Sequence, residues 1–215
     1  GGARIVDMAE NEGNLYVLTE QAIMVNKGGW ELFNSTPARA QCLAVHGSTI
    51  HVLGEHALYG LEGKRLRWKT MMPSMLNMPK SRIHTIRADA AGHLWVGTDD
   101  GVYIYDNTDY WIGPAEIETL PAESIYDITF GSDGTVYFGS DNGVIILDKG
   151  ALKYLGAKRW VPHTQVLCTA VNNKDGTIWA AISQGLSRIS AVRMTLSEKA
   201  AQHQKQTETY NLRDA

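Results

Sequence analysis

Acidic and amide side chains recur in pairs along the chain, and their chemistry suits binding or proton transfer. The clearest pairs are Glu20-Gln21, Glu55-His56, Asp99-Asp100, Asp141-Asn142 and Ser183-Gln184. Carboxylates of this kind can accept hydrogen bonds from a polar ligand, hold a cation, or act as general acids and bases. Asp, Asn and Glu are also ordinary residues of exposed turns, so a single pair indicates only a turn, whereas several pairs in one ring indicate a site.

The other residues with catalytic potential form no familiar motif. His46, His51 and His56 are close in sequence, but a strand expected between them keeps their side chains from converging on one zinc ion. No Gly-x-Ser-x-Gly turn, phosphate-binding loop or Cys-x-x-Cys pair is present. We therefore expect no metal and no cofactor, and we assign no catalytic residue.

Composition excludes two classes of partner. The formal net charge of −3 does not favour nucleic acid, because phosphate binding requires clustered Lys and Arg. No window of about 18 apolar residues occurs, so we expect no membrane span. A protein partner or a polar ligand, including a carbohydrate, remains.

A repeated glycine divides the chain into five similar segments that would position the polar turns. It stands at Gly13, Gly47, Gly92, Gly134 and Gly176. The spacings of 34, 45, 42 and 42 residues are close to the roughly 40–45 residues of a four-stranded propeller blade. Each glycine precedes a short apolar or aromatic run typical of a buried strand. The repeat predicts an all-β propeller of about five four-stranded blades.

Two further signals recur in fixed order around each glycine. An Asp-Gly or Asn-Gly turn follows the apolar run, most clearly at Asp100-Gly101 and Asn142-Gly143, where glycine supplies the positive φ of a tight hairpin. A proline precedes the first apolar strand by four residues, as Pro121 precedes Ile125. Three ordered signals per segment favour a true structural repeat.

The segment from Ile83 to Asp106 resembles the two-component-regulator propeller repeat. Its matching residues are Asp89, Gly92, Trp95, Gly97, Thr98 and Gly101. The repeat builds periplasmic sensor domains, and a related pattern occurs in streptogramin-lyase-like propellers. The resemblance covers roughly residues 4 to 190 as architecture and about half of them closely. It implies a sensor or binding domain and an extracellular or periplasmic location.

The repeat also predicts blade boundaries and domains. The blades are expected near residues 4–35, 39–70, 82–114, 124–160 and 165–194. Residues 3–194 then form the propeller, and residues 191–194 are the one candidate for the outer strand of the last blade. Because an open edge exposes unpaired backbone groups and apolar faces, we expect five blades to close a ring. A piece of a longer propeller is the alternative.

Residues 195–215 change in character. The run Thr195-Leu196-Ser197-Glu198 is typical of a capping box, in which the threonine hydroxyl and the glutamate carboxylate each bind a free amide. We expect a short C-terminal helix, either a connector to a further module or a frayed tail. We also expect Cys42 and Cys168 to be buried free thiols, because their blades are not neighbours.

The polar turns and the starts of the first strands should share the rim around the channel mouth, which we predict to be mostly acidic. Its ligand-binding candidates are Arg82, His84, Asp99, Asp100, Tyr126, Asp127, Asp141 and Gln165. A polar ligand, a cation or a basic partner segment would suit such a mouth.

Aromatic and methionine side chains form a second set of candidates. Trp95 and Trp179 are expected between blades, and Trp30, Trp68, Trp111 and Trp160 either pack between blades or serve as peripheral platforms for sugar rings. Four methionines within residues 71–78 could form an adaptable apolar contact. The candidates for a partner surface are Trp68, Met71, Met72, Met75, Met78 and Trp111.

These observations favour a non-catalytic binding module that presents its mouth to a partner protein or polar ligand. A carbohydrate-sensing domain of a receptor is the alternative, and a small lyase or hydrolase that uses the acidic mouth is a second one.

Overall fold

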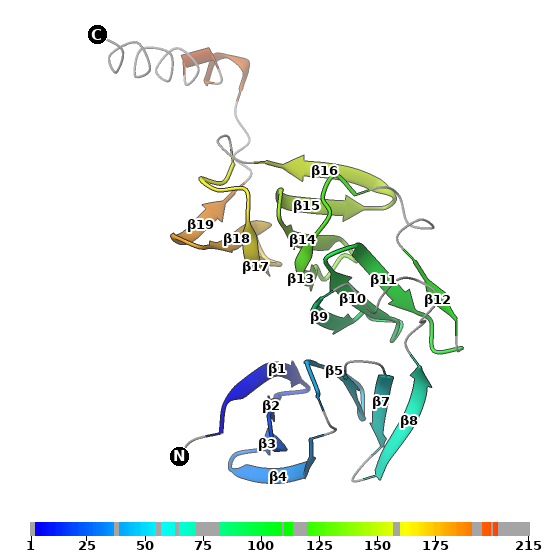
Figure 1. Cartoon of the computed structure of the whole chain (residues 1–215). Helices are drawn as coiled ribbons and strands as arrows, with labels where there is room; N and C mark the ends of the chain where they lie inside the picture. The colour runs from blue at the N-terminus through cyan, green and yellow to red at the C-terminus, as the bar shows by residue number, and fades with distance from the viewer. Residues whose placement is uncertain are drawn as a thin grey trace.

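The described residues fold into successive antiparallel β-sheets with almost no helix (Figure 1). The computed structural model describes residues 3–36, 39–54, 57–62, 65–71, 82–108, 110–113, 120–156, 160–190, 195–198 and 200–201. Within each sheet the strands lie side by side in the order in which they follow one another along the chain. This meander confirms the all-β propeller architecture.

Each sheet is one blade. Blade one comprises β1 (Ile5–Asn11), β2 (Asn14–Thr19), β3 (Ala22–Asn26) and β4 (Trp30–Ser35). Blade two comprises β5 (Cys42–His46), β6 (Thr49–Leu53), β7 (Ala57–Glu62) and β8 (Arg65–Met71). Blade three comprises β9 (Ile83–Ala88), β10 (Leu94–Thr98), β11 (Gly101–Tyr105) and β12 (Trp111–Ile112).

The last two blades follow the same plan. Blade four comprises β13 (Ile125–Phe130), β14 (Val136–Ser140), β15 (Gly143–Asp148) and β16 (Ala151–Leu155). Blade five comprises β17 (Val166–Asn172), β18 (Thr177–Ile182) and β19 (Gly185–Ile189). Its expected outer strand, residues 191–194, lies outside the described residues.

The turn chemistry inferred from the repeat is present. Gly101 and Gly143 adopt φ values of 100° and 108° at the starts of β11 and β15, a region that residues with a side chain rarely enter. Ahead of each turn, Thr98 and Ser140 donate their hydroxyls to the carbonyl oxygens of Gly101 and Gly143 at 3.0 and 2.9 Å. These bonds hold the hairpins that carry the polar pairs.

Apolar clusters between neighbouring blades hold the molecule together. Leu18 and Ile23 of blade one pack with Leu43 and Val52 of blade two, and three more clusters join the later pairs of blades. On blade three, Trp95 contacts Phe130 and Phe138 of blade four, with ring centroids 5.8 and 6.3 Å apart. The expected inter-blade position of Trp95 is confirmed.

The five blades form an open arc, and the prediction of a closed five-bladed ring is wrong. First strands of successive blades contact each other from β1 through β5, β9 and β13 to β17, but no comparable contact joins β17 to β1 among the described residues. Figure 1 shows the first and last blades apart. The side chains packed between blades decide the rotation from one blade to the next, and repeat spacing does not specify that rotation.

The open arc exposes apolar residues at both ends. Leu167, Trp179 and Leu186 of blade five are 45, 39 and 63% exposed, and Ile5 and Met8 of blade one are about half exposed. The prediction that Trp179 packs between blades is therefore wrong, because no described blade covers that side. The Arg188 guanidinium lies 5.8 Å from the centroid of the Trp179 ring.

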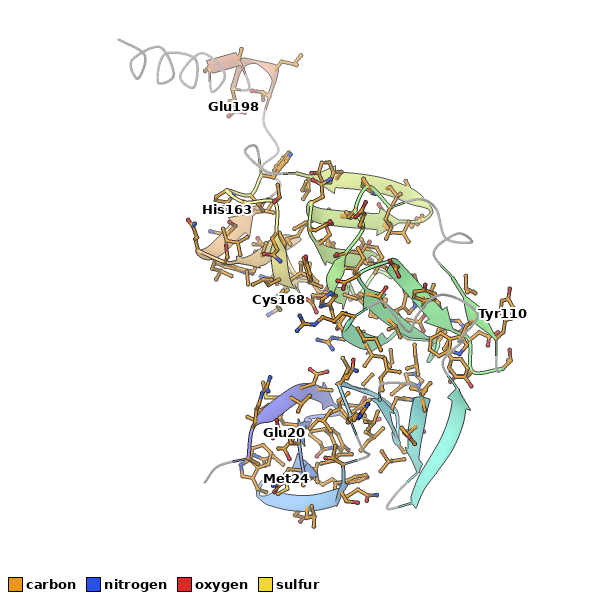
Figure 2. All side chains as sticks on the ribbon, viewed as in Figure 1. Glu20, Met24, Tyr110, His163, Cys168 and Glu198 are labelled. Atoms are coloured by element: carbon orange, nitrogen blue, oxygen red, sulfur yellow. The ribbon has the colours of Figure 1, made fainter. Side chains whose placement is uncertain are left out.

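The two cysteines are both free, and they differ in burial because only one of them lies between two described blades. Cys42 is buried in the cluster between blades two and three, and burial raises its pKa to about 12. Cys168, on the inner side of the last blade (Figure 2), is exposed. Its predicted burial is wrong because no following blade covers β17 in the described structure.

The predicted capping box is confirmed at the C-terminal helical residues 196–198 and 200–201. The Thr195 amide donates to the Glu198 carboxylate at 2.7 Å, and the Glu198 amide donates to the Thr195 hydroxyl at 3.3 Å. The first of these bonds lowers the pKa of Glu198.

Candidate ligand-binding site

The turns that follow the second strands meet the starts of the first strands on one rim. In three blades a backbone amide of the turn donates to a carbonyl just before the first strand. The bonds run from Glu20 to Arg4, from Asp99 to Arg82 and from Asp141 to Ser124, with N···O distances of 3.4, 3.1 and 3.1 Å. This repeated bond explains why residues 15 to 20 positions apart present their side chains together.

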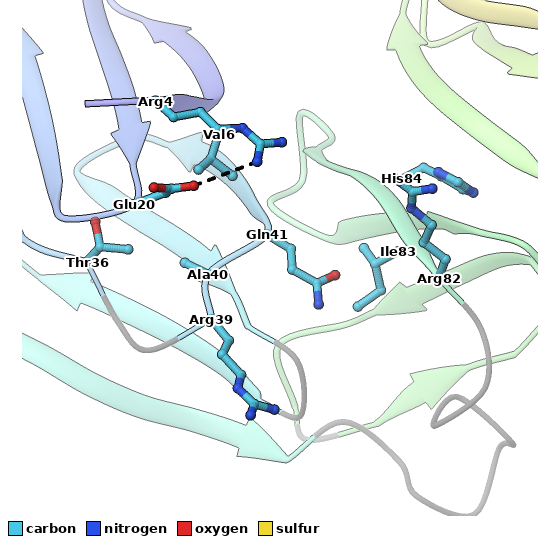
Figure 3. Close-up of a pocket in the computed structure, with 10 residues that line it drawn as sticks. All are labelled: Arg4, Val6, Glu20, Thr36, Arg39, Ala40, Gln41, Arg82, Ile83 and His84. Atoms are coloured by element: carbon cyan, nitrogen blue, oxygen red, sulfur yellow. Dashed lines mark ion pairs between the residues drawn. The ribbon is translucent and has the colours of Figure 1, made fainter. Parts of the chain in front are cut away.

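A pocket of about 630 Å³ opens on this rim across blades one, two and three. It is lined by Arg4, Val6, Glu20, Thr36, Arg39, Ala40, Gln41, Arg82, Ile83 and His84. Figure 3 shows Gln41 between the Arg4–Glu20 side of the pocket and the Ile83–Arg82 side. The volume lies within the range of small-molecule sites, about 300–1,000 Å³.

The charge of the pocket differs from the acidic mouth predicted from the sequence. Among the described residues that line it, the arginines are Arg4, Arg39 and Arg82, and the one carboxylate is that of Glu20. Arg4 and Glu20 form an exposed ion pair of 3.7 Å. The sequence singled out Arg82 and His84 but missed Arg4, Arg39 and Gln41, since these three precede first strands in the two blades that match the repeat least well.

His84, Asp99 and Tyr126 come together at the edge of the pocket. His84 Nε2 lies 2.6 Å from Asp99 Oδ1, so a carboxylate there requires the proton on Nε2. This bond is the main cause of the lowered pKa of Asp99. The His84 ring meets the Tyr126 ring edge to face, with centroids 4.8 Å apart. Asp99 thereby fixes the orientation of His84.

The Ser124 hydroxyl donates to Asp99 at 3.4 Å. A nucleophilic serine would instead donate to the histidine that removes its proton. With the carboxylate as the shared acceptor of both groups, this cluster orients side chains and does not activate the serine.

Asp127 lies deeper than the rim and serves the contact between blades. It is 4% exposed, and its carboxylate accepts bonds from the amide and the hydroxyl of Thr169 in blade five at 2.7 and 3.1 Å. A carboxylate committed to these donors joins two first strands, so its predicted place on the open mouth is wrong.

Arg87 connects two such carboxylates from different blades. Its Nη2 lies 3.4 Å from Asp127 Oδ1, and its Nη1 lies 3.8 Å from Asp7 Oδ2. Asp7 in turn accepts a bond from the Leu43 amide at 2.8 Å, and burial is the largest cause of its raised pKa. The sequence analysis missed this trio, although Ile-x-Asp opens both β1 and β13.

The remaining rim candidates lie apart from the pocket. Asp100 and Gln165 are exposed. Asp141 Oδ1 is buried without a hydrogen-bond partner in the part of the chain that is described. These residues follow the rim through blades three, four and five, so the eight candidates do not form one cluster.

The predicted partner surface receives little support from the described residues. Trp111 is buried against Tyr105, with ring centroids 5.1 Å apart; its assignment to an exposed surface is wrong, and its packing role is confirmed. Trp30 and Trp160 are exposed, which disfavours packing between blades and leaves the alternative of a peripheral platform as a prediction. Met72, Met75 and Met78 lie outside the described residues, as do the side chains of Trp68 and Met71.

A search of the described residues for a membrane-crossing helix finds none that is long and apolar enough. Over the same residues, no three His, Cys, Asp or Glu side chains gather as metal ligands would.

The five blades and the rim that they share define a β-propeller. Comparison with known protein families finds a match for one segment of the chain. Residues 77–100 match the two component regulator propeller family. The resemblance seen in blade three is thereby confirmed. No curated protein sequence matches the chain.

Solved propellers share the fold at low sequence identity. The extracellular domain described as belonging to a hybrid two-component system, BT3049 of B. thetaiotaomicron, aligns with a TM-score of 0.60 and 19% identity over 92% of this chain. The WD40 β-propeller domain of Doa1 gives 0.64 and 16% over 86% of the chain and 63% of its own length. YCF48 from Cyanidioschyzon merolae gives 0.58 and 13%, covering 89% of this chain and 68% of YCF48. The chain spans 29% of the BT3049 chain.

Proposed function

We propose that this chain is a non-catalytic ligand-binding region of a sensor propeller, located outside the cytoplasm or in the periplasm. The family match in blade three and the likeness to an extracellular sensor domain support this assignment. Residues 3–194 are proposed to form the propeller, and residues 195–215 a connector within a longer multidomain chain.

The observation that carries the proposal is the rim pocket shared by three blades. Its walls come from β-strand ends and turns held by backbone hydrogen bonds, so its shape is built into the fold. Val6, Ala40 and Ile83 provide apolar surface, and Gln41, Thr36 and His84 provide polar groups. A mostly rigid site with a few directed polar groups is typical of small-molecule recognition.

The chemistry of the rim supports binding over catalysis. Asp99 orients His84 and accepts a hydrogen bond from the Ser124 hydroxyl. The Asp127 carboxylate is already bonded to the Thr169 amide. We therefore propose Arg82, His84 and Gln41 as ligand contacts and Asp99 as a positioning residue. Asp100, Tyr126, Asp141 and Gln165 remain candidates for contacts of a larger ligand along the rim.

An array of neutral and acidic oligosaccharides tests the function directly. The folded chain should bind a subset of them, and the double variant Gln41→Ala/His84→Ala should lose that binding. Lys174→Ala, at an exposed residue of the turn between β17 and β18 in blade five, is the matched control and should bind as the parent does. A silent array, or binding that survives the double variant, contradicts the proposal for this pocket.

A further inference from the structure

We propose that the rim pocket recognises an anionic ligand, one whose carboxylate, sulfate or phosphate groups bind arginine side chains that line the pocket from different segments. This inference rests on the proposed function of the pocket and names its ligand class. Arg4 comes from blade one, Arg39 from the connection between blades one and two, and Arg82 from the start of blade three. Guanidinium forks bind planar and tetrahedral oxyanions through paired hydrogen bonds.

The charge of the pocket is opposite in sign to the net charge of the chain. The protein carries a formal charge of −3, yet the described residues that line this pocket include three arginines and one glutamate. The three arginines come from separate segments, and none of them belongs to the apolar clusters that pack between blades.

Two of the polar groups are available to a ligand. In the described part of the chain, the Arg82 guanidinium and the Gln41 amide group make no hydrogen bond or ion pair with another side chain. The Gln41 backbone is anchored by its amide, which donates to the Leu53 carbonyl at 2.8 Å. Both side chains line the pocket and can donate to an oxyanion.

Arg39 presents its side chain from an unfavourable backbone conformation. Its φ is 56°, in the left-handed region that residues other than glycine, asparagine and aspartate seldom adopt. Strained residues of this kind cluster at binding sites, where the surrounding structure fixes them.

Two carboxylates near the arginines set the strength of the site. Glu20 pairs with Arg4 at 3.7 Å, and the two side chains are 58 and 82% exposed, so the pair is weak and yields to a stronger anion. Asp99 is engaged by His84 and by the Arg82 amide, which leaves the Arg82 guanidinium to the ligand.

Calorimetric titration of the chain with citrate, inorganic sulfate and inorganic phosphate tests the proposal. We expect saturable binding of at least one anion, weakened by added sodium chloride because screening reduces the attraction. The variant Arg39→Gln/Arg82→Gln should lose about tenfold or more in affinity. Glu20→Gln should raise the affinity about two- to fivefold by freeing Arg4. Arg188→Gln, on blade five, is the matched control and should change nothing.

The outcomes separate this inference from the function beneath it. Saturable binding that both pocket variants shift in the stated directions supports an anion site, and the best of the three probes identifies the acid group. Absence of saturable binding, or binding that the pocket variants leave unchanged, overturns it. If neutral oligosaccharides bind and the three anions do not, the ligand-binding function stands and the anionic class falls. If neither kind binds, both proposals fail. Thermal unfolding of each variant checks that it is folded.

Discussion

Single carboxylates of this propeller serve different purposes according to their depth. Asp99 lies at the rim and orients His84, whereas Asp127 is buried and bonds to the next blade. Asp7 occupies the equivalent position in blade one and bonds to Leu43. Carboxylates on the first strands therefore join neighbouring blades, whereas the rim carboxylate of Asp99 orients a side chain of the pocket.

Replacing Asp7 by Asn should change how stability depends on pH. Burial raises the folded-state pKa of Asp7 above 3.8, so the folded state holds this proton to a higher pH than the unfolded state does. Stability contributed by this group is present below 3.8 and is lost as the pH rises through the raised value. In urea unfolding across this pH window, the free energy of unfolding of Asp7→Asn should rise relative to that of the parent protein as the pH rises. A constant difference between the two proteins contradicts the argument.

Individual strands approach one another closely where the repeat has glycine in the second strand. A Cβ atom at Gly97 would lie 2.7 Å from the carbonyl oxygen of Ile125, and one at Gly139 would lie 2.8 Å from that of Val166. In both cases the obstacle is the backbone of the next blade's first strand. These glycines set the spacing between blades three and four and between blades four and five.

Gly97→Ala should separate blades three and four and lower the free energy of unfolding by about 1–3 kcal/mol, the usual cost of overpacking. Gly29→Ala is the control, because no atom lies within 4 Å of a Cβ at that position and its φ is not in the left-handed region. Denaturant titration of both variants measures the difference. Equal stabilities would show that the interface absorbs a methyl group without cost.

At the scale of the molecule, a tryptophan at the same repeat position packs differently in the middle of the arc and at its end. Trp95 packs on two phenylalanines of the following blade and donates its indole N–H to Asp89 at 3.1 Å. Trp179 is 39% exposed, on the uncovered side of the last blade. The same repeat position is therefore partly buried between blades three and four and exposed on blade five.

Trp95→Ala should lower the free energy of unfolding by about 1–3 kcal/mol, because Trp95 is partly buried and packs on two rings, and Trp179→Ala by about 1 kcal/mol or less. Unfolding at two protein concentrations makes the comparison sharper. Similar losses in the two variants, with stability that rises with concentration, would show that another copy covers blade five in solution and would contradict the open arc.

Much of this molecule follows from local chemistry. The spacing of glycine, the Asp-Gly and Asn-Gly turns and the apolar runs specify hairpins of fixed length, so the sequence by itself determined the blades and the meander within each one. The capping box from Thr195 to Glu198 followed for the same reason, since its partners are three residues apart.

Only the tertiary structure decided how the blades are arranged and which side chains meet. The open ring, the exposure of Cys168 and Trp179, and the burial of Asp127 depend on rotations between blades, which arise from many side-chain contacts at long sequence separation. Arg4 and Arg82 occupy the same repeat position, just before the first strands of blades one and three, but the packing of the blades brings them and Arg39 to one pocket. A repeat pattern specifies the unit, and the packing between units determines the site.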